Sequence, residues 1–90
     1  MYKFRGYDVF VSDRKDKKYY AIVNKKRVYF GNRDYQHYHD KLGHYKELNH
    51  EDKPRRSNYR KRAAGITNSR GQKTYAIPGT ANWFAYHVLW

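Results

Sequence analysis

The chain has no cysteine, so no disulfide can stabilise it, and it contains only two prolines and six glycines in 90 residues. It also lacks long apolar runs, since no stretch approaches the roughly 20 residues that a helix needs to span a bilayer. The opening residues MYKFRGYDVF do not contain the apolar stretch of a signal peptide. These absences predict a protein that is not secreted, has no membrane partner and is made in a cytosol-like compartment.

Acidic residues are scarce and unevenly placed. The chain has 20 Lys and Arg against 8 Asp and Glu, which gives a net charge of +12. No acidic residue follows Asp52, and the segment from Thr74 to Trp90 contains no Lys, Arg, Asp or Glu. A strongly positive field attracts phosphate backbones, acidic proteins or anionic membranes, so the charge selects a class of partner but not one partner.

Residue sets typical of hydrolytic enzymes are missing as well. There is no Cys nucleophile, no Gly-rich phosphate-binding loop and no pair of carboxylates placed for metal-assisted hydrolysis. The pair YYAIV and VYFG weakly resembles the tyrosine motifs that open GIY-YIG nucleases. Those nucleases need an Arg on the following helix and a later metal-binding Glu, but the next segment here has no Arg and no acid lies beyond Asp52. We therefore expect no enzymatic activity, no catalytic residues and no cofactor.

Aromatic residues, in contrast, are abundant, at 19% of the chain. Disordered basic segments are poor in aromatics, so the chain is expected to fold. Because Leu and Ile are few, Tyr, Phe and Trp rings must form most of the core. The length fits one small domain, residues 1–90, with a polar amino-terminal part and an apolar end.

The first third of the chain has the pattern of strands. Residues 7–11, 18–23 and 27–31 are β-branched and aromatic with polar connections. Asn24 favours a tight hairpin turn between the last two, because Asn tolerates positive φ. Alternation places Tyr20 and Ile22 on one face and Tyr19, Ala21 and Val23 on the other.

The rest of the chain has the pattern of short helices. Tyr35, Tyr38, Leu42 and Tyr45 form a stripe that predicts a first short helix, interrupted or ended near Gly43. A second helix is expected from a cap at Asn49 or His50 to Ala64, with Gly65 as its stop. Residues 81–90 predict a buried helix capped by Thr80, although a strand is the alternative. The fold class is therefore α+β, with a small antiparallel sheet, made of a β-hairpin and an N-terminal strand, packed with two or three short helices.

The segment from Lys53 to Arg62 has six basic residues in ten and no acidic one. On a helix, two arginine columns would flank a tyrosine, which suits a phosphate backbone because Arg can bind phosphate oxygens in a bidentate way. The candidate nucleic-acid-binding residues are Arg55, Arg56, Tyr59, Arg60, Lys61 and Arg62. The alternative is a solvated helix face partly paired with Glu47, Glu51 and Asp52. Some of these arginines, Arg56 in particular, could instead pair inside the fold with Asp52 or with a backbone carbonyl.

The expected hairpin tip is a second basic cluster, formed by Lys25, Lys26 and Arg27 and reinforced by the preceding DRKDKK. A basic hairpin can enter a groove or follow a phosphate backbone. The alternative is that exposed lysines protect an edge strand from aggregation.

Four residues resemble a metal cluster, namely His37, His39, Asp40 and His44. Metal sites usually need three or four ligands that face one point. His37 and His39 are two residues apart and cannot face the same way on a helix, so we expect no metal site. His50 and His87 are interpreted as hydrogen-bonded structural groups.

Several segments together resemble a family of small basic proteins of unknown function from nucleocytoplasmic large DNA viruses. The similarity covers most of residues 19–90 and rests on KKRVYFG, DKPRRSNYRKRAAG and TANWFAYHVLW. The matching residues are Phe30, Gly31, Asp52, Arg55, Arg56, Tyr59, Arg62, Trp83, Leu89 and Trp90. Ala63 departs from the pattern, which has His there. The resemblance implies a viral origin, a compact fold and a location in the virion or in the host cytoplasm or nucleus, but no activity.

These observations favour a non-enzymatic nucleic-acid-binding protein of weak sequence specificity that neutralises phosphates in the packaging or organisation of viral DNA. DNA is favoured over RNA as the partner. The alternative is a minor virion protein that binds virion or capsid proteins through its basic surface and an aromatic C-terminal face. The oligomeric state is left open.

Overall fold

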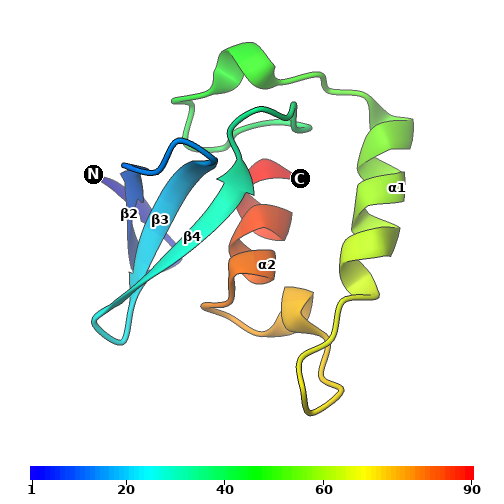
Figure 1. Ribbon diagram of the computed structural model, residues 1–90. Coiled ribbons are helices and arrows are strands. Elements are labelled where there is room, and N and C mark those ends of the chain that lie inside the picture. Colours follow the sequence, from blue (N-terminus) through cyan, green and yellow to red (C-terminus); the bar gives the residue numbers. More distant parts are fainter.

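A four-stranded antiparallel sheet forms one side of the protein, and the C-terminal helix packs against it (Figure 1). The computed structural model describes residues 1–90. The strands follow one another in the sheet in sequence order and are β1 (Tyr2–Phe4), β2 (Tyr7–Val11), β3 (Lys17–Val23) and β4 (Lys26–Asn32). The expected α+β fold with a small antiparallel sheet is therefore confirmed.

The turns of the sheet follow from residues that adopt positive φ. Asn24 and Lys25 have φ of 50° and 66°, and Val23 pairs with Lys26, so the β3–β4 turn has two residues as expected from Asn24. Arg5 and Gly6, with φ of 48° and 88°, connect β1 to β2 in the same way. β1 was not expected, because it has only three residues and its turn begins with Arg.

The core lies between the inner face of the sheet and the C-terminal segment. Its nine buried hydrophobic residues are Val9, Tyr19, Ala21, Phe30, Trp83, Phe84, Ala85, Val88 and Leu89. Phe30 stacks on Phe84 with ring centroids 5.1 Å apart, and Tyr7 meets Trp83 edge-on at 5.7 Å. Tyr19 and Ala21 face inward while Tyr20 faces Tyr29 on the outer side, which agrees with the predicted alternation.

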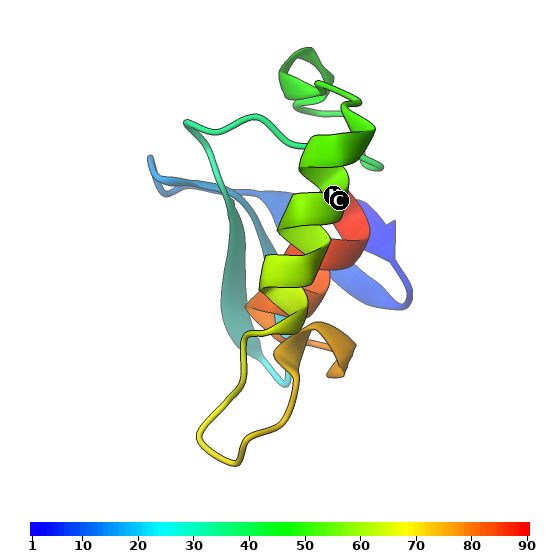
Figure 2. The same ribbon diagram turned by 90° about the vertical axis from the view of Figure 1, so that its right-hand side faces the viewer.

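The C-terminal segment is helical, as favoured over a strand. α2 (Ala81–Phe84) continues into the wider π-helical turns of η3 (Ala85–Leu89). The hydroxyl of Thr80 accepts a hydrogen bond from the backbone N–H of Trp83, which confirms the predicted N-cap. Figure 1 shows this helix between the sheet and α1, and Figure 2, turned by 90°, shows α1 in front of it.

The basic segment forms α1 (Lys53–Ala64), a helix of 12 residues. Its N-cap is Asp52, whose carboxylate accepts from the backbone N–H of Arg55, and not Asn49 or His50 as expected. The helix ends at Gly65 as predicted, although φ of −85° shows that no left-handed residue is needed there. Two short 3-10 turns, η1 (Lys46–Leu48) and η2 (Thr74–Ala76), complete the fold.

The helix predicted around Tyr35–Gly43 does not form, and η1 is the only helical turn between β4 and α1. The reason is Asp40, which is 2% exposed and accepts hydrogen bonds from the Tyr19 hydroxyl and from two backbone N–H groups, those of Leu42 and Tyr45. A side chain that binds nearby backbone N–H groups competes with the helical pattern. The hydrogen bonds of this buried carboxylate therefore determine the local backbone, and the helical spacing of the aromatic residues does not.

Candidate nucleic-acid interface

The six basic side chains of α1 form no ion pair. The four ion pairs of the protein join Lys3 to Asp8, Arg14 to Asp16, Arg27 to Asp13 and His39 to Glu51. The expected alternative of partial pairing within the helix is therefore not observed, because Glu51 pairs with His39 and Asp52 caps the helix. The positive charge of α1 is not neutralised by the protein itself.

Two of the predicted binding residues, Arg56 and Arg60, instead hold the fold together. Both donate to the backbone carbonyl of Trp90, at 2.8 and 3.0 Å. The ring of Tyr38 lies 4.6 Å from the Arg56 guanidinium, and that of Tyr86 lies 4.9 Å from the Arg60 guanidinium. The expectation that Arg56 could pair with a backbone carbonyl is confirmed.

These arginines complete the capping of the C-terminal helix. The carbonyl of His87 accepts from the Lys41 ammonium, that of Val88 from the Lys41 backbone N–H, and that of Leu89 from the His39 backbone N–H. The last carbonyls of a helix have no partner within it and carry partial negative charge. Here three cations, Arg56 and Arg60 of α1 and Lys41 of the preceding loop, supply positive charge, and two backbone N–H groups of the loop bind the remaining carbonyls.

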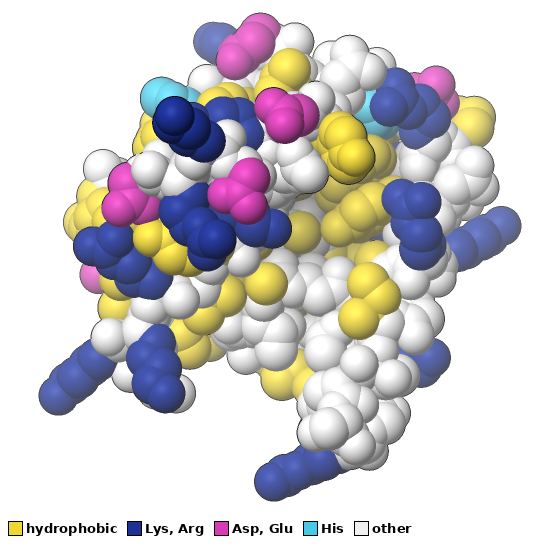
Figure 3. All heavy atoms as spheres, in the orientation of Figure 1, with side chains coloured by type: hydrophobic (Ala, Val, Ile, Leu, Met, Phe, Trp, Pro, Cys, Tyr) yellow, Lys and Arg dark blue, Asp and Glu magenta, His cyan; other side chains and the backbone are white.

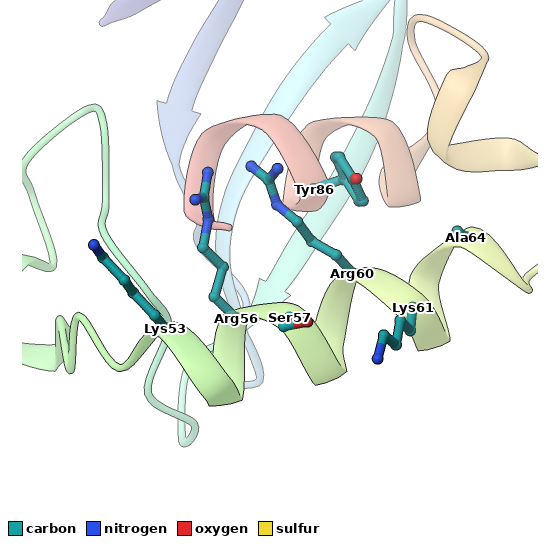
Figure 4. A pocket seen from close by; sticks show the side chains of 7 residues that line it. All are labelled: Lys53, Arg56, Ser57, Arg60, Lys61, Ala64 and Tyr86. Carbon is teal, nitrogen blue, oxygen red and sulfur yellow. The ribbon is translucent and has the colours of Figure 1, made fainter.

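A groove of about 450 Å³ separates α1 from the C-terminal helix. It is lined by Lys53, Arg56, Ser57, Arg60, Lys61, Ala64 and Tyr86, which include four cations and no acid. Figure 4 shows Arg56 and Arg60 pointing from α1 toward the C-terminal helix, whereas Lys61 points away from it. The groove therefore has a cationic wall with both fixed and free side chains.

Burial and the electrostatic crowding of this region lower the pKa values of two of its residues, Lys41 and His87. Burial lowers the pKa of Lys41, and the positive charges of Arg60, Arg5 and Arg56 lower it further. Burial and then the charges of Arg5 and Lys41 likewise lower the pKa of His87. Neighbouring positive charges repel one another, and a bound anion would reduce this repulsion.

Tyr59 is only partly available to a ligand. Its ring stacks on Trp90 with centroids 4.2 Å apart and planes 9° from parallel, and burial raises its pKa. One face of the ring is thus used to attach α1 to the C-terminal helix. The predicted stacking of Tyr59 on a base could therefore use only the other face of the ring.

Four cations of α1 remain exposed and unpaired with acids, namely Lys53, Arg55, Lys61 and Arg62. Arg55 donates to the side-chain oxygen of Gln36 at 3.0 Å. The guanidinium of Arg62 lies 5.8 Å from the ring of Tyr59. Lys53 was not among the predicted binding residues, although it lies within the same charge run.

The basic cluster at the hairpin tip, Lys25, Lys26 and Arg27, also contains both unpaired and paired side chains. Lys25 and Lys26 are exposed and have no partner, whereas Arg27 pairs with Asp13, donates to the hydroxyl of Tyr29 and lies over the ring of Tyr20. Figure 1 shows the hairpin tip and α1 on opposite sides of the C-terminal helix. The two clusters are separate basic regions and not one continuous track.

The C-terminal aromatics, needed as a docking face by the alternative function, lie largely in the core. Trp83 is 5% exposed and Phe84 is fully buried. Tyr86, His87 and Trp90 are half-buried. The face offered to a partner is accordingly much smaller than the sequence of this segment suggests.

The residues of the suspected metal cluster go to different partners. His37 contacts the side-chain oxygen of Asn49 at 2.6 Å, His39 pairs with Glu51, Asp40 binds Tyr19, and the ring of His44 packs on Tyr45. No group of three or more His, Cys, Asp or Glu side chains is placed to hold a metal ion. His50 has a structural hydrogen bond, as expected, since its Nδ1 accepts from the backbone N–H of Asp52.

Comparisons with protein families, curated proteins and solved structures found no match for this chain. None of its helices is both long enough and apolar enough to cross a bilayer.

Proposed function

We propose that this protein is a non-enzymatic nucleic-acid-binding protein that contacts the phosphate backbone with the exposed side of α1. The observation that carries the proposal is that none of the six cations of this helix has an acidic partner in the fold. Lys53, Arg55, Lys61 and Arg62 would neutralise phosphates, while Arg56 and Arg60 keep their carbonyl partner and position the helix. Lys25 and Lys26 would form a second, independent contact.

Contacts of this kind predict weak sequence specificity, because phosphates carry no direct sequence information. They also predict a steep dependence on salt, since each neutralised phosphate releases condensed counterions. The resemblance to viral proteins adds a setting to the proposal, namely DNA packaging or organisation in the virion or in the host cytoplasm or nucleus. DNA is then the favoured polymer, and virion or capsid proteins are further partners of the basic surface.

The proposal is tested by reversing charge on the exposed side of α1 while leaving Arg56, Arg60 and Arg62 in place. The variant Lys53→Glu, Arg55→Glu, Lys61→Glu should fold, because all three side chains are exposed and acidic residues suit the first turn of a helix, where Lys53 and Arg55 lie. Its affinity for duplex DNA at moderate salt should fall by about 10²-fold or more, as expected when several phosphate contacts are lost.

The matched control is Lys15→Glu, Arg70→Glu, Lys73→Glu, which makes the same change in net charge at exposed positions outside α1. Fluorescence anisotropy with labelled duplex DNA measures both variants. Equal losses of affinity in the two variants would mean that only the net charge matters, and α1 would not be the interface.

A further inference from the structure

A second cavity, of about 230 Å³, lies on the other side of α1, between this helix and the end of β4. Its floor is formed by Ala85, Leu89 and Trp90 of the C-terminal segment, and its polar lining comes from Lys18, Asn32, Tyr35, Gln36 and Arg62. Figure 3 shows the hollow between the sheet and α1, with hydrophobic side chains on its floor and Lys or Arg side chains along its α1 side. The volume is below the roughly 300–1,000 Å³ of sites for drug-sized ligands, so it suits a smaller ligand.

Lys18 is the unusual residue of this cavity, because it is only 1% exposed and forms no ion pair. Its ammonium donates one hydrogen bond, to the backbone carbonyl of Tyr35 at 2.6 Å. Burial lowers the pKa of Lys18 to about 8, against the opposing charge of Asp40. An ammonium has three N–H donors, so two are left without a protein acceptor at the wall of a cavity.

The backbone is shaped to bring Lys18 to this place. Gly31 has φ of 77°, and a Cβ built there would lie 2.8 Å from a methyl of Leu89 and 3.3 Å from the Cβ of Lys18. Glycine therefore allows β4 to pass close to both side chains at the inner end of the cavity. Burying a lysine without an ion pair costs free energy, and a ligand that accepts its hydrogen bonds would recover part of that cost.

The lining defines the chemistry of the ligand. Lys18 and Arg62 are its only charged residues and no acid is present, so the ligand is an anion or a strong acceptor. Tyr35, 68% exposed, and the stacked pair of Tyr59 and Trp90 provide flat surfaces for a planar ring. A ring that carries acceptors toward Lys18 and a phosphate toward Arg62 satisfies both conditions.

We infer that this cavity binds one unpaired guanine nucleotide, with Lys18 donating to the base and Arg62 to the phosphate. Guanine fits best because its N7 and O6 are two adjacent acceptors, which match the two free donors of Lys18, whereas adenine presents an amino group beside its N7. The choice of a nucleotide over other ringed anions rests on the proposed function. The nucleotide is either free or part of a single strand.

The test is isothermal titration of the protein with GMP and with AMP. GMP should bind, and AMP should bind at least about tenfold more weakly, as expected for a contact worth about 1–3 kcal/mol. Lys18→Met should fold, since a buried methionine avoids a buried charge, and should reduce GMP affinity at least about tenfold. Lys73→Met removes an exposed lysine outside the cavity and outside both basic clusters, and should bind GMP like the wild type.

The source of the nucleotide is distinguished with short dT strands. If a dT strand with one central dG binds the wild type more tightly than an all-dT strand, and Lys18→Met abolishes the difference, the ligand is an unpaired base of a strand. If only GMP responds to Lys18→Met, the ligand is a free nucleotide. Equal GMP binding by wild type and Lys18→Met, or no preference for guanine in either format, would overturn the inference.

This outcome is separable from that of the proposed function. The variant Lys53→Glu, Arg55→Glu, Lys61→Glu keeps Lys18 and Arg62, so it should retain GMP binding while losing duplex DNA. Duplex binding with no GMP binding would remove the cavity site and leave the α1 interface. GMP binding that depends on Lys18, without binding of any duplex, would support the cavity site and exclude the α1 interface.

Discussion

Single residues decide much of this structure, and the buried ones are the least visible in the sequence. Asp40 belongs to a stripe with helical spacing, yet its carboxylate accepts from two backbone N–H groups and the Tyr19 hydroxyl and prevents a helix. Lys18 lies in a basic run of the sequence, yet it is 1% exposed and packs close to Gly31. Neither outcome follows from the spacing of residue types, because the Tyr19 hydroxyl that binds Asp40 and the close approach of Gly31 to Lys18 both come from the folded sheet.

The low pKa of Lys18 predicts that stability rises with pH in the alkaline range. The unfolded chain keeps this proton to about pH 10.5, whereas the folded protein loses it above about pH 8, so between these values the unfolded state binds more protons. The free energy of unfolding should therefore increase by about 2 kcal/mol between about pH 7.5 and about pH 9.5. Above about pH 10 the raised pKa of Tyr19 works in the opposite direction.

Urea unfolding at both pH values measures this change, with Lys18→Met as the control. The variant should lose most of the increase, while the smaller contribution of Lys41, whose pKa is also lowered, remains. A variant with the same pH dependence as the wild type would show that Lys18 is solvated in the folded protein.

Gly31 gives a second prediction for a single residue. Gly31→Ala should lower the free energy of unfolding by about 1–3 kcal/mol, because alanine is strained at positive φ and its Cβ would contact Leu89. Gly6→Ala is the matched control, since Gly6 has a similar φ of 88° but no atom lies within 4 Å of the position that a Cβ would occupy. The difference between the two variants in the free energy of unfolding, measured with urea, gives the cost of the contact with Leu89. Equal losses would mean that backbone strain at positive φ explains the whole effect.

Among the elements, those with strong local signals were predictable and those stabilised by distant contacts were not. The hairpin with Asn24 in its turn, the helix up to Ala64 and the helix after Thr80 all form as the sequence predicts. β1 and the segment 35–45 were missed or wrong, since a three-residue strand has too little pattern and Asp40 overrides the aromatic stripe. The charge run on α1 was recognised, and so was the alternative that Arg56 binds a backbone carbonyl, but the same role of Arg60 was not singled out.

The attachment of α1 depends mainly on Trp90. Arg56 and Arg60 bind the carbonyl of this residue, and Tyr59 stacks on its ring. Arg56→Gln, Arg60→Gln should therefore lower the free energy of unfolding by about 1–3 kcal/mol and increase amide exchange in α1 before other elements.

Lys53→Gln, Lys61→Gln is the matched variant for this prediction, because it removes the same charge from the free side of the helix. It should reduce DNA affinity with little effect on stability. If both double variants have equal stability, the two arginines do not anchor the helix, and they are free to bind phosphate like their neighbours.

At the scale of the whole molecule, the protein separates an aromatic interior from a cationic exterior. The core rings come from the sheet and the C-terminal helix, and all ion pairs lie in the sheet and in the loops beside it and before α1. Six of the cations without an acidic partner lie on α1, and two more, Lys25 and Lys26, lie at the tip of the β3–β4 hairpin, in a chain whose net charge is +12. The total charge was evident from composition, whereas its distribution required the fold.

The most direct test of the account is the dissociation constant for duplex DNA measured across a series of salt concentrations. Four free cations on α1 predict a slope of log affinity against log salt of about −3 to −4 for the wild type, and a slope of about −1 for Lys53→Glu, Arg55→Glu, Lys61→Glu, which keeps only Arg62 of the four. The variant Lys15→Glu, Arg70→Glu, Lys73→Glu should keep the wild-type slope. Salt-independent binding by the wild type, or an unchanged slope in the α1 variant, would contradict the claim that this helix is the interface.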